Sequence, residues 1–273
     1  MKSAVTICLV PEAKLGPFVF HTSLAEGCAL AARAGFDAVE IFPPSAAGID
    51  EPALRAALTQ HGLSVAAIGT GAGWVVRKLS LTSPDPALRA QARAFIREII
   101  EVAGRFGAPA ILGSMQGRVD ASSNREETLG WLADALEELG EAAAKFGVPF
   151  LYEPLNRYET DLFHRQEDAA NFLRTLKTKK VRLLCDLFHM AIEEVDLAAT
   201  LRACGPLVGH IHFADSNRRA IGLGHTDAAP LVAALRDIHY AGYLSAEILP
   251  LPDPATAAST TMAAFRKLVP RAA

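Results

Sequence analysis

The chain has 273 residues, of which 51% are hydrophobic, and its 27 basic and 30 acidic residues give a formal net charge of −3. High apolar content with little net charge excludes intrinsic disorder, and the lack of a basic surplus argues against a nucleic-acid partner. The four cysteines form no CxxC pair, so we expect buried thiols in a reducing compartment. No stretch approaches the roughly 18 apolar residues of a membrane span, and we expect a cytoplasmic protein.

Short apolar runs alternate along the chain with longer, alanine-rich amphipathic stretches. Each apolar run has the length of a strand buried on both faces, and each amphipathic stretch has the length of a helix. The expected strands are Val5–Val10, Ala38–Phe42, Ser64–Thr70, Pro109–Gly113, Phe150–Glu153, Val181–Asp186, Val208–Phe213 and Leu244–Leu249. The expected helices lie near residues 23–34, 51–61, 86–106, 125–146, 167–177, 196–203, 228–240 and 255–268.

This alternation predicts an α/β fold, a parallel sheet closed into a (β/α)8 TIM barrel with about 30 residues per unit. The alternative, an open doubly wound sheet, usually carries a glycine-rich nucleotide turn after its first strand, and Val10–Lys14 contains no glycine. The glycine-rich segment Gly69–Gly73 lacks the spacing of a phosphate-binding loop, and we interpret it as a mobile loop that covers the substrate. No proline- or serine-rich linker divides the chain, so we expect one domain over residues 1–273.

Four consecutive late strands each carry a polar residue at or near the carboxyl end. These residues are Glu153, Asp186, His212 and Glu247. In a TIM barrel the carboxyl ends of the strands meet at one mouth, where active sites are built. Three carboxylates converging there would repel one another unless a cation neutralised them. Carboxylate oxygens and an imidazole suit Mn²⁺, Mg²⁺, Co²⁺ or Zn²⁺, so the pattern predicts one divalent metal ion at this mouth.

Three other polar residues lie close to these strand ends in the sequence. His210 is two positions before His212 and shares its face of the strand, so we interpret it as a buried hydrogen-bonding residue and not as a ligand. His189 follows the sixth strand, where a neutral imidazole could donate to a substrate oxygen. Arg218 could hold and polarise a substrate oxygen through its planar donor fork, the alternative being a surface arginine.

Further candidates allow two interpretations or none. Glu159 either contacts the substrate or forms a loop salt bridge with Arg157 or Arg165. Trp74, after the third strand, either stacks on a sugar ring or packs as part of a lid. His225 lies in a segment that we interpret as a turn in which Asp227 caps the next helix. Gln116 has no assigned role.

Four motifs carry a resemblance to a known family. They are Tyr152–Glu159 (YEPLNRYE), Asp186–His189 (DLFH), His210–Arg218 (HIHFADSNR) and Ala246–Glu247. In order and spacing they resemble the xylose isomerase-like TIM-barrel superfamily, and within its sugar phosphate isomerases and epimerases the D-tagatose 3-epimerase and D-psicose 3-epimerase branch. Two segments differ from that branch: Ala214-Asp215 stands in place of Gly-Glu, and Gly69–Leu79 is unlike the epimerases.

The resemblance implies a TIM barrel, one divalent metal ion and a set of site residues. The metal, Mn²⁺ by preference with Co²⁺, Mg²⁺ or Zn²⁺ as alternatives, is implied to be bound by Glu153, Asp186, His212 and Glu247. Glu153 and Glu247 are implied to act as the acid/base pair. Glu159, His189 and Arg218 match positions that contact the sugar.

Together these observations predict a metal-dependent isomerase, most simply one that epimerises ketoses at C3 by moving a proton through a metal-stabilised enediolate. Return of the proton to the adjacent carbon would give an aldose–ketose isomerase of the hydroxypyruvate type, and loss of a hydroxyl would give an inosose-type dehydratase. An AP endonuclease of the endonuclease IV type is disfavoured, because the early strand ends Val10, Phe42 and Thr70 offer no histidine ligand.

The expected partner is therefore a small-molecule sugar, with no nucleic acid and no membrane. We see no multi-arginine phosphate site in the sequence, which favours an unphosphorylated sugar. A homodimer or homotetramer is compatible with these features.

Overall fold

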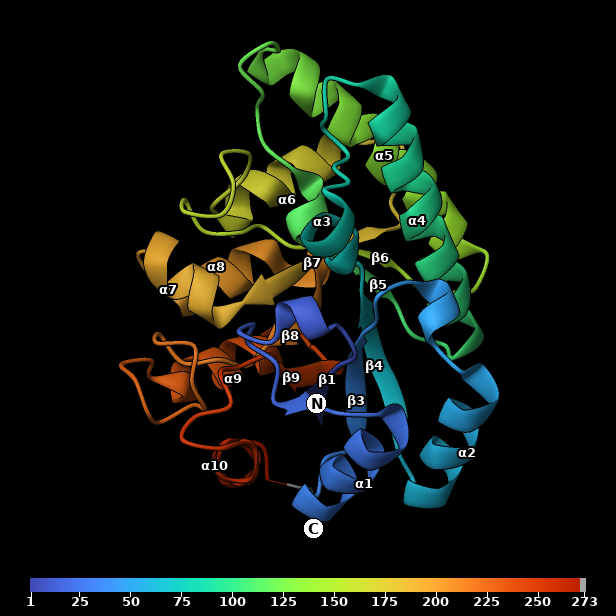
Figure 1. Cartoon of the computed structure of the whole chain (residues 1–273). Helices are drawn as coiled ribbons and strands as arrows, with labels where there is room; N and C mark the ends of the chain where they lie inside the picture. Colours follow the sequence, from blue (N-terminus) through green and yellow to red (C-terminus); the bar gives the residue numbers. More distant parts are fainter. Residues whose placement is uncertain (271–273) are drawn as a thin grey trace.

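The computed structural model describes residues 1–270, and within them eight parallel strands close into a barrel that helices surround (Figure 1). The barrel strands are β1 (Lys2–Cys8), β3 (Ala38–Phe42), β4 (Ser64–Gly69), β5 (Ala110–Leu112), β6 (Phe150–Tyr152), β7 (Val181–Asp186), β8 (Val208–His212) and β9 (Tyr243–Ala246). Each strand pairs with the next in this order, and β9 pairs with β1 from Lys2 opposite Tyr243 to Val5 opposite Ala246. A two-residue strand, β2 (Phe20–His21), extends the end of β1. The predicted (β/α)8 barrel is confirmed.

The outer helices fall where the amphipathic pattern places them. They are α1 (Leu24–Ala34), α2 (Glu51–His61), α4 (Pro86–Arg105), α5 (Arg125–Ala144), α6 (Gln166–Thr175), α8 (Leu197–Cys204), α9 (Ala228–Asp237) and α10 (Pro254–Leu268). Helix α4 shows how the sequence sets them: Asp85 caps its first turn by accepting from the Ala87 N–H, and Pro86 occupies its first position. Its buried residues, Ala92, Phe95, Ile96, Ile99, Ile100, Val102 and Ala103, recur mainly at three- and four-residue steps and pack toward the barrel.

Two further helices lie at the carboxyl ends of the strands. Helix α3 (Ala72–Arg77) follows β4, and α7 (Leu187–Glu193) follows β7 without a break. The interpretation of Gly69–Gly73 as a loop is therefore wrong for most of its length, because Gly69 ends β4 and Ala72 and Gly73 begin α3. This helix packs against two short 3-10 helices, η1 (Pro11–Ala13) and η3 (Ser114–Gln116). Two more 3-10 helices are η2 (Ala46–Gly48) and η4 (Gly205–Leu207).

Alternate residues of each strand face the inside of the barrel. Ala67, Ile111, Leu151 and Leu184 from β4 to β7 form one buried cluster there, and Ala4, Ala38 and Ala66 form another. Because apolar side chains fill these inner layers, the inward polar residues come together only toward the carboxyl end. The strand period of two thus places Glu153 two residues beyond Leu151 and Asp186 two residues beyond Leu184, on the same inner face.

Two expectations from composition can be compared with the structure. All four cysteines, Cys8, Cys28, Cys185 and Cys204, are free and buried. No helix of the described residues is long and apolar enough to cross a membrane.

Candidate active site and metal centre

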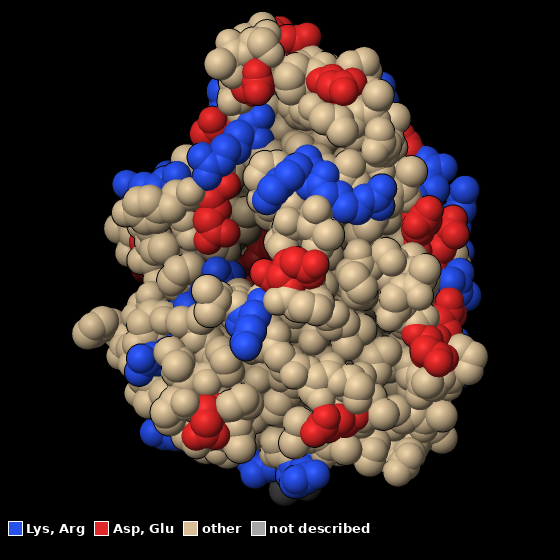
Figure 2. All heavy atoms as spheres, viewed as in Figure 1, with Lys and Arg blue, Asp and Glu red and all other residues tan. Residues whose placement is uncertain are grey.

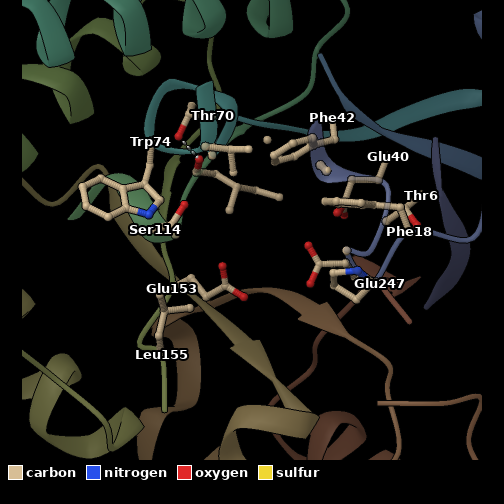
Figure 3. A pocket seen from close by; sticks show the side chains of 18 of the residues that line it. Thr6, Phe18, Glu40, Phe42, Thr70, Trp74, Ser114, Glu153, Leu155 and Glu247 are labelled. Atoms are coloured by element: carbon tan, nitrogen blue, oxygen red, sulfur yellow. Dashed lines mark hydrogen bonds between the residues drawn. The ribbon is translucent and has the colours of Figure 1, made fainter. Parts of the chain in front are cut away.

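The structure brings the four predicted metal ligands to one point. Glu153 follows β6, Asp186 and His212 end β7 and β8, and Glu247 follows β9. One ligand atom from each of the four lies within 4.8 Å of the others. The Nδ1 atom of His212 is 3.3 Å from Glu153 Oε1, 3.6 Å from Asp186 Oδ2 and 3.4 Å from Glu247 Oε2. In Figure 3 the carboxylates of Glu153 and Glu247 face each other across the cavity.

These ligand atoms lack partners within the described residues. Glu153 Oε1, Asp186 Oδ2 and His212 Nδ1 are buried and accept or donate no hydrogen bond there. Each unsatisfied buried polar group costs about 1–3 kcal/mol, so three at one point indicate a missing partner common to all of them. Three carboxylate oxygens with one imidazole nitrogen form a donor set that suits a hard or borderline divalent cation. The site can therefore hold a divalent metal ion.

Glu40, in the middle of β3, is a residue of this centre that the sequence analysis missed. Its Oε2 accepts a hydrogen bond from His210 Nε2 at 2.8 Å, and its Oε1 accepts one from His212 Nε2 at 3.1 Å. A carboxylate only accepts, so it holds a proton on Nε2 of both rings. His212 is thereby left with Nδ1 as the atom that faces the three carboxylates. The interpretation of His210 as a buried hydrogen-bonding residue is confirmed.

The charges that the site residues exert on one another determine which of them carry a proton when no metal is bound. Burial alone would lower the pKa of His212, but the carboxylates around it, Glu247 and Glu40 first, raise that pKa well above its usual value. Burial raises the pKa of Glu247 to about 7, and the charges on Glu153 and Asp186 contribute to the rise against the opposing effect of the nearby cations. Without a metal ion, His212 therefore carries a proton near neutral pH, and Glu247 is partly protonated.

His189, on α7, presents a single ring nitrogen to this centre. Its Nδ1 lies 2.7 Å from the Asn156 side-chain nitrogen and accepts from the Asn156 backbone N–H at 3.4 Å. Because Nδ1 accepts, the proton of the neutral ring belongs on Nε2. That Nε2 lies 3.6 Å from Asp186 Oδ2 and has no hydrogen-bond partner among the described residues. It is available to a ligand oxygen.

Arg218 points into the site, so the interpretation as a surface arginine is wrong. Its side chain is only 17% exposed, its Nη2 donates to Glu247 Oε2 at 2.9 Å, and the same nitrogen lies 3.6 Å from Asp186 Oδ2. Its guanidinium lies over the Phe188 ring at 4.8 Å. Arg218 has a φ of 59°, a left-handed backbone conformation that a non-glycine residue adopts only when its surroundings impose it.

Asp215 imposes this loop conformation. Its buried carboxylate accepts the backbone N–H groups of Ser216, Gly222, Gly224 and Thr226 at 2.7–2.9 Å. These four bonds gather the segment after β8 around one side chain, and Arg218 lies inside that segment. Asp215 is a second residue whose role the sequence analysis did not identify.

Glu159 faces the same side chains and not the surface ion pairs considered for it. It accepts from Asn156 Nδ2 at 3.1 Å and lies 3.7 Å from Arg218 Nη1. Its alternative partners bind elsewhere: Arg157 binds Glu193 and Arg165 binds Glu194. The salt-bridge alternative is therefore wrong.

Gln116 and Asp227 stabilise the backbone near the site. Gln116 is buried, accepts from the Tyr152 hydroxyl at 2.7 Å and donates to the backbone carbonyl of Glu153 at 2.9 Å, which supports the main chain next to the metal centre. Asp227 caps α9 by accepting from the Ala229 N–H at 3.1 Å. The interpretation of the His225 segment as a turn is thus confirmed.

A cavity of about 340 Å³ lies above the metal centre. Its floor includes Glu153 and Glu247, and one side is formed by Glu159, His189 and Arg218. The opposite walls come from the first half of the chain and include Phe18, Phe42, Thr70, Trp74 and Ser114 (Figure 3). Figure 2 shows a hollow in this face, with acidic atoms at its depth and charged side chains of both signs at its rim.

Comparisons with known proteins agree with this arrangement. A family model described as a xylose isomerase-like TIM barrel matches residues 28–268. The chain is 30% identical to an L-ribulose 3-epimerase of Methylomonas sp. (strain DH-1), over 80% of this chain and 75% of the relative. It is 28% identical to a D-psicose 3-epimerase of Ruminiclostridium cellulolyticum, over 77% of this chain and 73% of the relative.

Among solved structures, the chain is similar to a 3-keto-D-glucoside 4-epimerase from E. coli. That similarity has a TM-score of 0.82 and 25% sequence identity, and covers 98% of this chain and 100% of the other. The predicted resemblance to sugar epimerases is confirmed.

Replacement of Glu40 by glutamine tests how the centre is oriented. An amide oxygen can accept from one imidazole, but its NH₂ group cannot accept from the other, so Glu40→Gln should misplace the proton on His212. We expect divalent metal affinity to fall about 10–100-fold, measured by competition with a chelating dye.

The matched control is Glu194→Gln, which also changes a buried carboxylate but one that binds Arg165 and the Gln166 backbone N–H. It should leave metal affinity unchanged. Full metal affinity in a folded Glu40→Gln protein would contradict the role given to Glu40.

The charged state of the metal-free centre predicts how pH affects metal binding. A cation must displace protons from His212 and Glu247, so affinity should rise with pH by about tenfold per pH unit for each proton displaced. The contribution of Glu247 should end as pH passes about 7, whereas the raised pKa of His212 keeps its contribution present above that pH. Calorimetry in buffers of different ionisation enthalpy counts the protons released.

Stability of the metal-free protein should change in the opposite direction. Folding raises the pKa of Glu247 from 4.5 to about 7, so its contribution is full below 4.5 and is lost as pH rises through 7. Thermal unfolding of the chelator-treated protein should show this loss. A metal affinity that is constant from about pH 5 to pH 8 would contradict the expectation for binding, and a melting temperature of the metal-free protein that does not fall as pH rises through 7 would contradict the expectation for stability.

Proposed function

Because the chain belongs to the xylose isomerase-like TIM barrel family, we propose that it is a divalent-metal-dependent isomerase that epimerises keto-sugars, with ketose 3-epimerisation as the expected reaction. One observation carries the proposal: Glu153 and Glu247 face each other across one cavity, each within 3.4 Å of His212 Nδ1. Two carboxylates on opposite sides of a cavity can serve the two faces of a planar intermediate. The relatives described above are epimerases of sugars that carry a carbonyl group.

We propose Glu153, Asp186, His212 and Glu247 as the metal ligands and Mn²⁺ as the preferred ion. A bound divalent cation would supply positive charge that stabilises the negative charge developing on the substrate oxygens. The three unpartnered ligand atoms described above support this assignment. A cytoplasmic location is part of the same proposal, and the free buried thiols support it.

The proton transfer is assigned to Glu153 and Glu247. One carboxylate removes the proton from the carbon next to the carbonyl, and the other delivers a proton from the opposite face, which inverts that carbon. The structure holds both groups in place: Arg218 donates to Glu247 Oε2 at 2.9 Å, and the Glu153 N–H donates to the Leu112 carbonyl at 3.0 Å. A Cβ at Gly113 would lie 2.6 Å from Glu153 Oε2, so glycine there leaves room for the carboxylate.

The remaining polar side chains are proposed to hold the sugar. His189 Nε2–H and the Arg218 guanidinium can donate to substrate oxygens, and Glu159 can accept from a hydroxyl. Glu159 links the two donors, since it lies 3.9 Å from His189 Nδ1 and 3.7 Å from Arg218 Nη1. These three groups therefore act as one binding face beside the acid/base pair.

Replacement of Glu247 tests the acid/base assignment. Free ketoses are incubated with the Mn²⁺-loaded enzyme in D₂O, and NMR identifies the carbon that gains deuterium. Deuterium at C3 with inversion indicates epimerisation, whereas deuterium at the neighbouring carbon indicates aldose–ketose isomerisation. Glu247→Gln should slow exchange by about 10²–10⁴-fold while keeping the circular dichroism of the folded barrel.

Glu193→Gln is the control, because that carboxylate binds Arg157 and does not line the cavity. It should retain normal exchange. Normal exchange in Glu247→Gln would refute the assignment of this residue.

Metal removal tests the cofactor requirement. Dialysis against EDTA should abolish deuterium exchange without unfolding the protein, because the barrel interior is closed by apolar clusters that need no ion. Added Mn²⁺ should restore exchange and raise the melting temperature by mass action. Co²⁺, Mg²⁺ and Zn²⁺ are compared in the same assay. Undiminished exchange in protein shown by elemental analysis to be metal-free would disprove the metal dependence.

A further inference from the structure

A second cavity, of about 610 Å³, adjoins the reaction cavity. Trp74, Ser114, Leu155 and Glu159 line both cavities, so the two are compartments of one hollow. Figure 3 places Trp74, Ser114 and Leu155 together on one side of the reaction cavity, away from Glu40 and Glu247. A molecule seated at the metal centre would therefore extend past Trp74 to reach the second compartment.

The second compartment has none of the proposed reaction chemistry. Glu153, Glu247, His189 and Arg218 line the reaction cavity, and within the described residues none of the proposed metal ligands and neither of these donors lines the second compartment. At about 340 Å³ that cavity already lies within the ~300–1,000 Å³ range of small-molecule sites. A single sugar ring can be held there, and it would leave the second compartment empty.

The lining of the second compartment suits a neutral, hydroxyl-rich group. Trp74 is 39% exposed at the junction, where its ring offers an apolar face, and the Lys78 ammonium lies 5.2 Å from that ring. Basic Lys78 and Arg118 are balanced by acidic Asp120 and Glu159 on the same walls.

Arg118 is also partly committed, since it donates to the Tyr158 backbone carbonyl at 2.7 Å. Hydroxyl side chains complete the lining, from Ser80, Thr82, Ser83 and Ser114. The Thr82 hydroxyl already donates to the Gln116 backbone carbonyl at 2.8 Å. An aromatic face, mixed charge and several hydroxyls fit a sugar ring better than a phosphate, which would need an uncompensated cluster of cations.

We propose that the second compartment is a subsite for a second sugar ring, so that the enzyme acts preferentially on a keto-sugar joined to another sugar by a glycosidic bond. Trp74 is the specificity-determining residue at the junction, where it stacks on the second ring. The inference rests on the proposed function for the identity of the reacting ring. It goes beyond that function by assigning the non-reacting half of the substrate.

Paired substrates test the subsite in the Mn²⁺-loaded enzyme. D-fructose is compared with the disaccharides isomaltulose and lactulose, and 3-keto-D-glucose with 3-keto-trehalose. We expect KM to be at least tenfold lower for a disaccharide than for its single-ring partner. Trp74→Ala should remove that advantage, because it should raise KM for the disaccharide at least tenfold more than it raises KM for the single-ring partner.

Val76→Ala is the matched control, because Val76 lies on the same helix and is exposed but lines neither compartment. It should leave both kinetic constants unchanged. Equal KM values for the single-ring and two-ring substrates would overturn the proposal. So would a Trp74→Ala protein that loses activity equally on both.

A binding experiment separates failure of the subsite from failure of the proposed reaction. The chain has two tryptophans, so Trp131→Phe leaves Trp74 as the only indole. Its fluorescence should respond to each disaccharide at a concentration at least tenfold below that needed for the single-ring sugar, whether or not turnover occurs. The same response to both kinds of sugar would disprove the subsite. Absence of deuterium exchange with every sugar would disprove the reaction alone.

Discussion

Repulsion among three buried carboxylates is the constraint around which the rest of the site is organised. Glu153, Asp186 and Glu247 would each be costly to bury alone, and bringing them together adds like-charge repulsion. His212 lies between all of them, with its Nδ1 3.3–3.6 Å from one oxygen of each. Arg218 adds a permanent positive charge from the side. A centre with this excess of negative charge is suited to a divalent cation.

His212 and Arg218, the two positive groups, are each positioned by a further carboxylate outside the three-carboxylate cluster. Glu40 accepts from the far ring nitrogen of His212 and so decides which nitrogen turns toward the metal centre. Asp215 gathers four backbone N–H groups and so fixes the loop that carries Arg218. Glu40 and His212 are 172 positions apart in the chain, and only closure of the barrel brings β3 and β8 within hydrogen-bond distance. The barrel therefore orients the centre as well as positioning it.

This dependence explains which features the sequence could predict. Glu153, Asp186, His212 and Glu247 stand at or just beyond the ends of apolar strands, and the period of two places them on the inner face with no knowledge of the partner strands. Glu40 carries a weaker signal, a single charged residue inside the apolar run Ala38–Phe42. Its role depends on which histidines lie opposite it across the barrel. The sequence alone does not show which residues of distant strands face each other. Helix α3 was missed because Gly69, Gly71 and Gly73, at and before its start, favour a loop, whereas packing against η1 and η3 stabilises the helix.

The proposed metal ligands and the cavity walls opposite the proposed sugar-binding face come from different halves of the chain. The proposed metal ligands and acid/base pair follow β6 to β9, within the same stretch whose motifs resemble the sugar epimerases. The walls that limit the shape of a bound molecule come from the segments after β1 to β5, including Phe18, Phe42, Trp74 and Ser114. Metal-assisted proton transfer constrains the first set to a few residue types, whereas a cavity wall can be built from many side chains of suitable size. The motifs can therefore indicate the chemistry, but the choice of sugar has to be derived from the shape and lining of the two compartments.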